Sequence, residues 1–68
     1  MKTTHYVLET LKEIRRANNL TQAELGNRAG YSRFQIAEWE RGAHDPRINV
    51  VSNISEALGY ELVLRPKR

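Results

Sequence analysis

The fold is decided by residues 20–35, which read LTQAELGNRAGYSRFQ. Thr21 and Glu24 have the spacing of a capping box, in which a hydroxyl and a carboxylate three residues apart each accept from the other residue's backbone amide. Ser32 and Gln35 repeat this spacing, with a side-chain amide in place of the carboxylate. Each box marks the first turn of a helix, so the stretch predicts two helices in close succession.

A short turn joins these two predicted helices. Gly30 suits the left-handed conformation in which helices end, so the first helix spans only residues 22–29. The second helix begins after Ser32, and Gly42 supplies its stop. Two short helices joined by a glycine-containing turn of about three residues are typical of a helix-turn-helix. Gly26 lies inside the first helix, where glycine costs about 1 kcal/mol relative to alanine, so we expect another part of the backbone to approach it closely.

Helical periodicity on both sides of this stretch predicts two more helices. Apolar residues recur at helical spacing between Thr4 and Asn18. Pro46 fits the first position of a last helix, which Gly59 ends. The residues expected to face the core are Ile36, Ala37 and Trp39 in the third helix and Ile48, Val51, Ile54, Ala57 and Leu58 in the last. The predicted fold class is therefore all-α, with one helical domain over residues 1–59.

The remaining residues, 60–68, form a predicted dimerisation segment. The run from Tyr60 to Pro66 is rich in strand-forming residues. Because residues 1–59 offer no second strand, its backbone groups need a partner, and the same strand of a twofold-related copy is the simplest one. The dimer contacts would be made by Tyr60, Leu62, Val63 and Leu64. Alternatively, the segment packs on the first helix as an extended tail, through its two leucines.

Composition excludes several functional classes. The chain has no cysteine, and its two histidines, His5 and His44, lie far apart in the sequence and lack the spacing of metal ligands, so we expect no disulfide, no metal and no other cofactor. No arrangement of nucleophile and base, or of paired carboxylates, indicates an enzyme. The apolar runs are too short to span a membrane, which predicts a cytoplasmic protein.

The short length of the chain favours a homo-oligomer, and its charge is compatible with a polyanionic partner. A domain of 68 residues has a small core, which oligomerisation would help to stabilise. The formal net charge of +3 is compatible with nucleic acid, although so small an excess is common in unrelated proteins.

Ordered motifs along the chain resemble the Cro/phage-repressor (XRE) family of helix-turn-helix regulators. The residues that carry the resemblance are LTQAEL at 20–25, GYSR at 30–33, Ile36, WERG at 39–42, Pro46 and ALG at 57–59. Residues 57–66 also resemble the HipB-like antitoxins, a narrower subset in which a terminal strand pairs across the dimer. The resemblance implies a lambda-repressor-like domain of four to five helices, a homodimer, and double-stranded DNA with a palindromic operator as its partner.

The resemblance leaves two functions open. The first is a sequence-specific transcriptional regulator, a dimeric repressor of an inverted-repeat operator. The alternative is an antitoxin that binds a toxin protein and autoregulates its operon. A toxin gene next door would favour the antitoxin, whereas a divergent promoter in a prophage would favour the repressor.

The resemblance also implies which side chains read the bases. The third helix would lie in the major groove with its first turn at the base edges. Arg33 can donate to guanine, and Gln35 can pair with adenine. Glu38 can accept from cytosine, and Phe34 can contact a thymine methyl group. Two of these residues have an alternative, because Phe34 could belong to the core and Glu38 could form a surface ion pair with a neighbouring arginine.

Phosphate contacts and one ion pair complete the predicted site. Gln22 lies at the start of the first short helix, where the helix amides also attract an anion. The other predicted phosphate contacts are Ser32, Arg41 and Arg47. Family members usually carry Ser or Thr at the position of Arg47, so the cap of the last helix is expected to move to Asp45. The family's basic–acidic pair matches Arg15 and Glu40, which predicts a partly buried bridge between the first and third helices.

Overall fold

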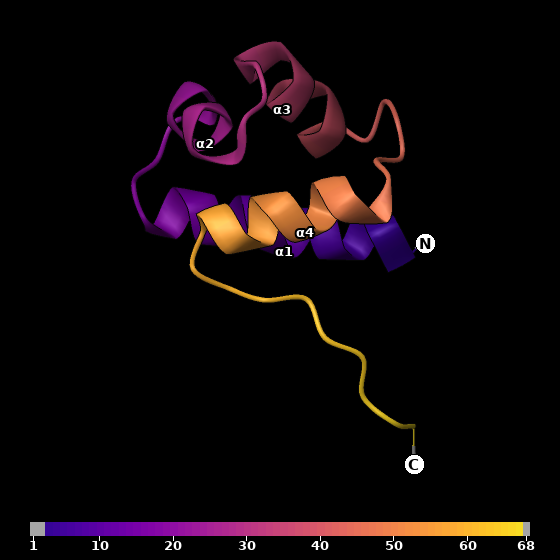
Figure 1. Cartoon of the computed structure of the whole chain (residues 1–68). Coiled ribbons are helices and arrows are strands. Elements are labelled where there is room, and N and C mark those ends of the chain that lie inside the picture. The colour runs from indigo at the N-terminus through magenta and orange to yellow at the C-terminus, as the bar shows by residue number, and fades with distance from the viewer. Residues whose placement is uncertain (1–2, 68) are drawn as a thin grey trace.

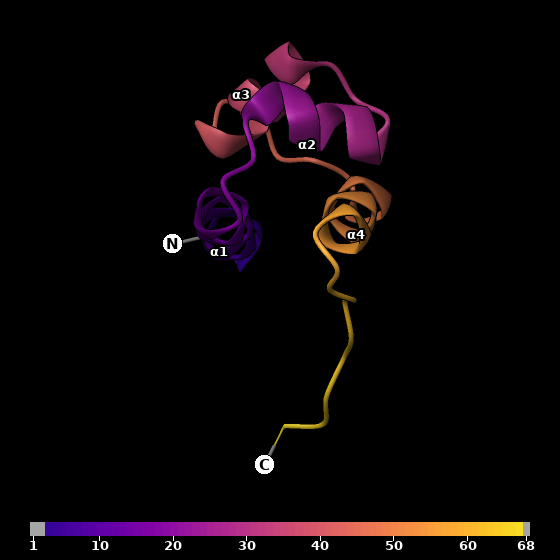
Figure 2. The same cartoon turned by 90° about the vertical axis from the view of Figure 1, so that its left-hand side faces the viewer.

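The protein folds into helices arranged in two layers. The structure, a computed structural model, describes residues 3–67, and these contain α1 (Thr3–Ala17), α2 (Gln22–Ala29), α3 (Arg33–Glu40) and α4 (Ile48–Ala57). α1 and α4 lie side by side, and α2 and α3 cover one side of this pair (Figure 1). Figure 2 shows the same two layers with α1 and α4 seen almost end-on. The all-α fold class is confirmed, and no helix in this part of the chain is long and apolar enough to cross a membrane.

The core is assembled from every helix. Its buried members are Leu11, Leu25, Ile36, Val51 and Ile54. Leu25 of α2 and Ile36 of α3 are the most completely enclosed, with 2% and 1% of their surfaces exposed. Full burial of a side chain of this size contributes about 1.5–3 kcal/mol. The inward faces of α2 and α3 are thus held against the α1–α4 pair, and their outward faces meet solvent.

Both capping boxes predicted from the sequence are confirmed. The Glu24 amide donates to the Thr21 hydroxyl at 3.0 Å, and the Thr21 amide donates to the Glu24 carboxylate at 2.8 Å. In the second box, the Gln35 amide donates to the Ser32 hydroxyl at 3.2 Å and the Ser32 amide donates to Gln35 Oε1 at 3.0 Å. The backbone and side-chain hydrogen bonds of Thr21 favour the ionised carboxylate, so they hold the pKa of Glu24 below its ordinary value.

The turn between α2 and α3 has a fixed geometry. Gly30 ends α2 with φ 88°, a left-handed conformation that glycine adopts without strain. The amides of Gly30 and Tyr31 both donate to the carbonyl oxygen of Gly26 at 2.8 Å. The Tyr31 ring lies edge-on to Trp39, with centroids 5.0 Å apart, and its hydroxyl accepts from Asn53 Nδ2 at 2.8 Å. The turn is therefore tied to α2, α3 and α4 together.

The predicted start of the last helix is wrong. α4 begins at Ile48, so Pro46 lies before the helix, and Arg47 occupies the N-cap position in an extended conformation. The Arg47 side chain makes no cap hydrogen bond, because it lacks the short oxygen acceptor that an N-cap uses. Ile48, expected in the buried stripe, is 73% exposed because it stands at the end of the helix, where few neighbours cover it. Val51 and Ile54 are buried as predicted.

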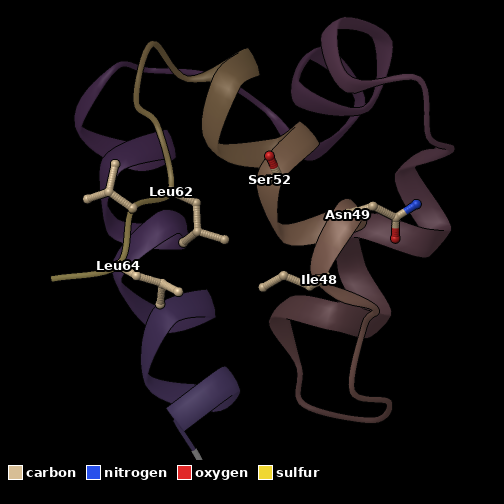
Figure 3. A pocket seen from close by; sticks show the side chains of 6 residues that line it. Ile48, Asn49, Ser52, Leu62 and Leu64 are labelled. Atoms are coloured by element: carbon tan, nitrogen blue, oxygen red, sulfur yellow. The ribbon is translucent and has the colours of Figure 1, made fainter. Parts of the chain in front are cut away.

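The predicted strand at the C-terminus is absent from the structure of the single chain. Residues 60–67 form no strand and run as an extended tail away from the helices, on the side opposite α3 (Figure 1). A single strand has no ladder of backbone hydrogen bonds to join, which accounts for the difference. The tail does not pack tightly on α1 either, since Leu62 is 40% and Leu64 102% exposed. Figure 3 shows Leu62 and Leu64 facing Ile48 of α4 across an apolar groove.

Candidate nucleic-acid interface

The first turn of α3 presents an exposed cation beside an exposed aromatic ring. Arg33 and Phe34 are both exposed, and Phe34 keeps 68% of its surface in solvent. The Arg33 guanidinium carbon lies 4.9 Å from the centroid of the Phe34 ring, which is cation–π contact. Ile36 of the same helix fills the core, so Phe34 is left outside it. Of the two alternatives for Phe34, the core position is wrong.

Ser32 and Gln35 are both engaged in capping α3. The Ser32 hydroxyl accepts from the Gln35 amide, and Gln35 Oε1 accepts from the Ser32 amide. Reading adenine with a glutamine requires both its oxygen and its nitrogen. Gln35 therefore has free side-chain N–H donors, but its oxygen would have to be shared with, or released from, the helix cap.

Glu38 and Arg41 form an ion pair on the surface of α3. Arg41 Nη2 and Nε donate to Glu38 Oε2 at 2.6 and 3.1 Å, and the two side chains are 67% (Arg41) and 42% (Glu38) exposed. The Arg41 hydrogen bonds hold the pKa of Glu38 below its ordinary value, and His44, with Nε2 3.8 Å from Glu38 Oε1, lowers it further when charged. In the free protein, the Glu38 carboxylate is therefore paired with Arg41 at the surface. This is the alternative to the cytosine contact that was expected from the sequence.

A buried network of hydrogen bonds joins α1 to α3. Arg15 of α1 donates to both carboxylate oxygens of Glu40, with Nε–Oε2 at 2.7 Å and Nη2–Oε1 at 2.9 Å. Its remaining nitrogen, Nη1, donates to the carbonyl oxygen of Leu20 at 2.6 Å. Both charged side chains are only 8% exposed. The ion pair expected between α1 and α3 is therefore present, and it is fully bidentate.

Gln22 belongs to the same network, which the sequence did not indicate. Gln22 Nε2 donates to Glu40 Oε1 at 3.0 Å, although this side chain was expected to point at a phosphate. The second Nε2 hydrogen of Gln22 lies outside this bond, so the residue can still donate to an anion while it is held by Glu40. No spacing rule could have found this contact, because the two residues lie on different helices and 18 positions apart.

The predicted contacts do not gather at one point. Ser32, Arg33, Phe34 and Gln35 share the start of α3, whereas Gln22 lies beside Glu40 at the other end of that helix. Arg47 is exposed at the N-cap of α4, in the loop that follows α3. These positions are spread along α3 and its flanking ends, as an interface with an extended ligand would require.

Known proteins match this chain along most of its length. The family model described as Helix-turn-helix matches residues 11–64, which include all of α2, α3 and α4. An HTH-type transcriptional regulator, y4dL, of Sinorhizobium fredii (strain NBRC 101917 / NGR234) is 32% identical over 65 residues, which are 96% of this chain and 33% of that protein. The immunity repressor protein of Bacillus phage phi105 is 32% identical over 54 residues, 79% of this chain and 38% of the repressor.

The matched family is described as helix-turn-helix, which is the arrangement that the two capped helices and the turn between them form in the structure. The chain spans about a third of the length of these curated relatives. The matched segment is the one that carries the two capping boxes, the turn and the buried network. The chain therefore belongs to the Cro/phage-repressor (XRE) family of helix-turn-helix proteins, a family of DNA-binding transcriptional regulators.

Proposed function

We propose that this protein is a dimeric repressor that reads an inverted-repeat operator with the first turn of α3. The observation that carries the proposal is the division of α3 into two faces. Ile36 anchors the inner face in the core, while Arg33 and Phe34 project from the outer face next to each other. A short helix that is fixed from behind and exposed at its start is the geometry that major-groove reading requires.

Phosphate contacts are proposed on either side of this turn. Gln22 lies in the first turn of α2, where unpaired helix amides and the helix dipole favour an anion. Ser32 is the N-cap residue of α3, and Arg47 is the N-cap residue of α4. Arg41 is a fourth candidate, and it would exchange part of its bond to Glu38 for a phosphate. Such contacts position a protein on DNA without reading its sequence.

Loss of the Arg33 side chain is expected to weaken operator binding by about 1–3 kcal/mol and to relax the preference at one base pair. The reason is that a bidentate arginine–guanine contact discriminates among bases. Fluorescence anisotropy of Arg33→Ala with operator and scrambled duplexes at one salt concentration measures both effects. Gln22→Ala is the control, since a phosphate contact affects all sequences alike. Equal losses on both duplexes for Arg33→Ala would remove it from base reading.

The dimer is proposed to form through the tail. Tyr60, Val63 and Leu64 are 54%, 67% and 102% exposed, and the backbone of residues 60–67 forms no strand within the chain. Pairing of two tails would satisfy these backbone groups and cover the apolar side chains in one step. A twofold dimer would also match the twofold symmetry of an inverted repeat, with half-sites about one helical turn apart.

Removal of residues 60–68 is expected to yield a monomer that binds operator poorly, because each monomer would hold only one half-site. None of the buried core side chains lies in the tail, so the helices should keep their circular dichroism spectrum. Sedimentation velocity of the full and shortened chains measures the change. Leu64→Lys provides a milder variant, since this side chain is fully exposed and does not support the fold. A shortened protein that still sediments as a dimer would contradict pairing through the tail.

Repression is favoured by the relative from Bacillus phage phi105, whose name is immunity repressor protein. The antitoxin function, a toxin partner and membership of the HipB-like subset stay predictions from the sequence. DNase footprinting on the upstream region of the protein's own gene is the experiment that tests repression most directly. Protection of two half-sites would support the proposed repressor, and no protection of any region would oppose autoregulation.

A further inference from the structure

Two of the four predicted base readers are engaged elsewhere in the free protein. The oxygen of Gln35 accepts from the Ser32 amide, and Glu38 is paired with Arg41. The side chains of the other two, Arg33 and Phe34, make no hydrogen bond or ion pair within residues 3–67. The surface that is ready to meet a base edge is therefore this pair of neighbouring side chains.

The contact between the two side chains leaves their binding groups available. A guanidinium group carries five N–H donors, and its cation–π contact with a ring is not a hydrogen bond to another acceptor, so these donors stay available. The Arg33 guanidinium lies 4.9 Å from the centre of the Phe34 ring, and the ring is still 68% exposed. Contact with the ring restricts the long arginine side chain and leaves its hydrogen-bond donors available. The result is a fork of hydrogen-bond donors held beside an apolar surface.

These two chemistries match two groups on the major-groove edge. A fork of donors fits the O6 and N7 atoms of guanine, and an apolar ring fits the C5 methyl group of thymine. Because the side chains touch, the two targets must belong to neighbouring base pairs. The geometry points to Arg33 and Phe34 acting as one unit that reads a guanine and a thymine in adjacent base pairs, with the thymine methyl group packed on Phe34. This inference rests on the proposed reading of DNA by α3.

A thymine methyl group can be removed without altering base pairing, which allows a direct test. The full chain is first used to select duplexes from a random pool, and the half-site is read from the bound sequences. Thymine next to the recurrent guanine is then replaced by deoxyuridine. We expect wild-type binding to weaken roughly fourfold, the amount that corresponds to one buried methyl group. Phe34→Ala should bind the thymine and deoxyuridine duplexes equally, because the ring that senses the methyl group is gone.

A second pair of duplexes provides the matched control. Cytosine and 5-methylcytosine at the thymine position differ by the same methyl group, so wild type should prefer the methylated duplex and Phe34→Ala should not. Phe34 lies outside the core, so its replacement should leave the thermal unfolding midpoint unchanged.

The outcomes separate this inference from the proposed function. Selected sites without a recurrent guanine–thymine neighbour, or a deoxyuridine effect that is the same in wild type and Phe34→Ala, would overturn the reading unit and leave operator binding intact. A selection that enriches no sequence, with no salt-dependent binding of any duplex, would overturn the proposed function itself.

Discussion

Replacement of Glu40 by alanine is expected to lower the free energy of unfolding by about 3–5 kcal/mol, because it leaves the Arg15 charge buried without a partner. The Arg15 and Glu40 side chains are 8% exposed, and two hydrogen bonds of 2.7 and 2.9 Å join them. The change also removes the acceptor of Gln22 Nε2. A domain of this size has a total stability of only about 3–10 kcal/mol, so a large part of it would be lost.

A double-mutant cycle in urea measures this coupling. Arg15→Met and Glu40→Met are each expected to destabilise strongly, whereas the double variant should lose much less than the sum, since no unpaired charge remains. Glu38→Ala is the matched control on the same helix. Its bridge to Arg41 is exposed to water, and we expect its removal to change stability little. Additive losses for Arg15 and Glu40 would contradict a coupled buried pair.

Gly26→Ala is expected to destabilise the domain by about 2–3 kcal/mol, although alanine favours a helix by about 1 kcal/mol. A Cβ atom at this position would collide with the backbone oxygen of Tyr31. Backbone cannot swing aside as a flexible side chain can. The Tyr31 amide also donates to the Gly26 oxygen at 2.8 Å, so relief of the collision would open the turn that sets α3 against α2.

Thermal unfolding followed by circular dichroism tests the close approach at Gly26. Asn27→Ala is the control, because Asn27 is the exposed neighbour on the same helix and its replacement gains helix propensity without a collision. We expect Asn27→Ala to unfold at or slightly above the wild-type temperature, and Gly26→Ala well below it. A Gly26→Ala protein at least as stable as wild type would show that the turn can shift without cost.

Local patterns in the sequence were sufficient for the helix-turn-helix itself. The Thr21 and Ser32 caps and the Gly30 stop depend on contacts within a few residues, and each predicted feature is present. The start of α4 could not be predicted in the same way. Pro46 is tolerated in a first helical turn, but nothing in its local sequence decides whether the helix begins there or at Ile48. The exposure of Ile48 depends on which other elements reach that end of the helix.

The site was predicted less completely than the fold for a related reason. The Arg15–Glu40 pair was expected from family resemblance, and it is present. The bond from Gln22 to Glu40 depends on how α2 crosses α3, which no local pattern specifies. Gln35 was assigned both a cap and a base contact, and its oxygen serves the cap in the free protein. Residue types alone identified candidate base-contacting residues. They could not show which polar atoms of these side chains already have hydrogen-bond partners in the free protein.

The tail leaves the helices on the side away from α3, and both views agree on this (Figure 2). A polypeptide can therefore be lengthened beyond residue 67 without obstructing the surface proposed to face the duplex. The relatives from Sinorhizobium fredii and phage phi105 are about three times as long as the stretch they share with this chain. An exit on the far side would let further domains be joined to this module, while α3 keeps the approach to the groove that is proposed for it.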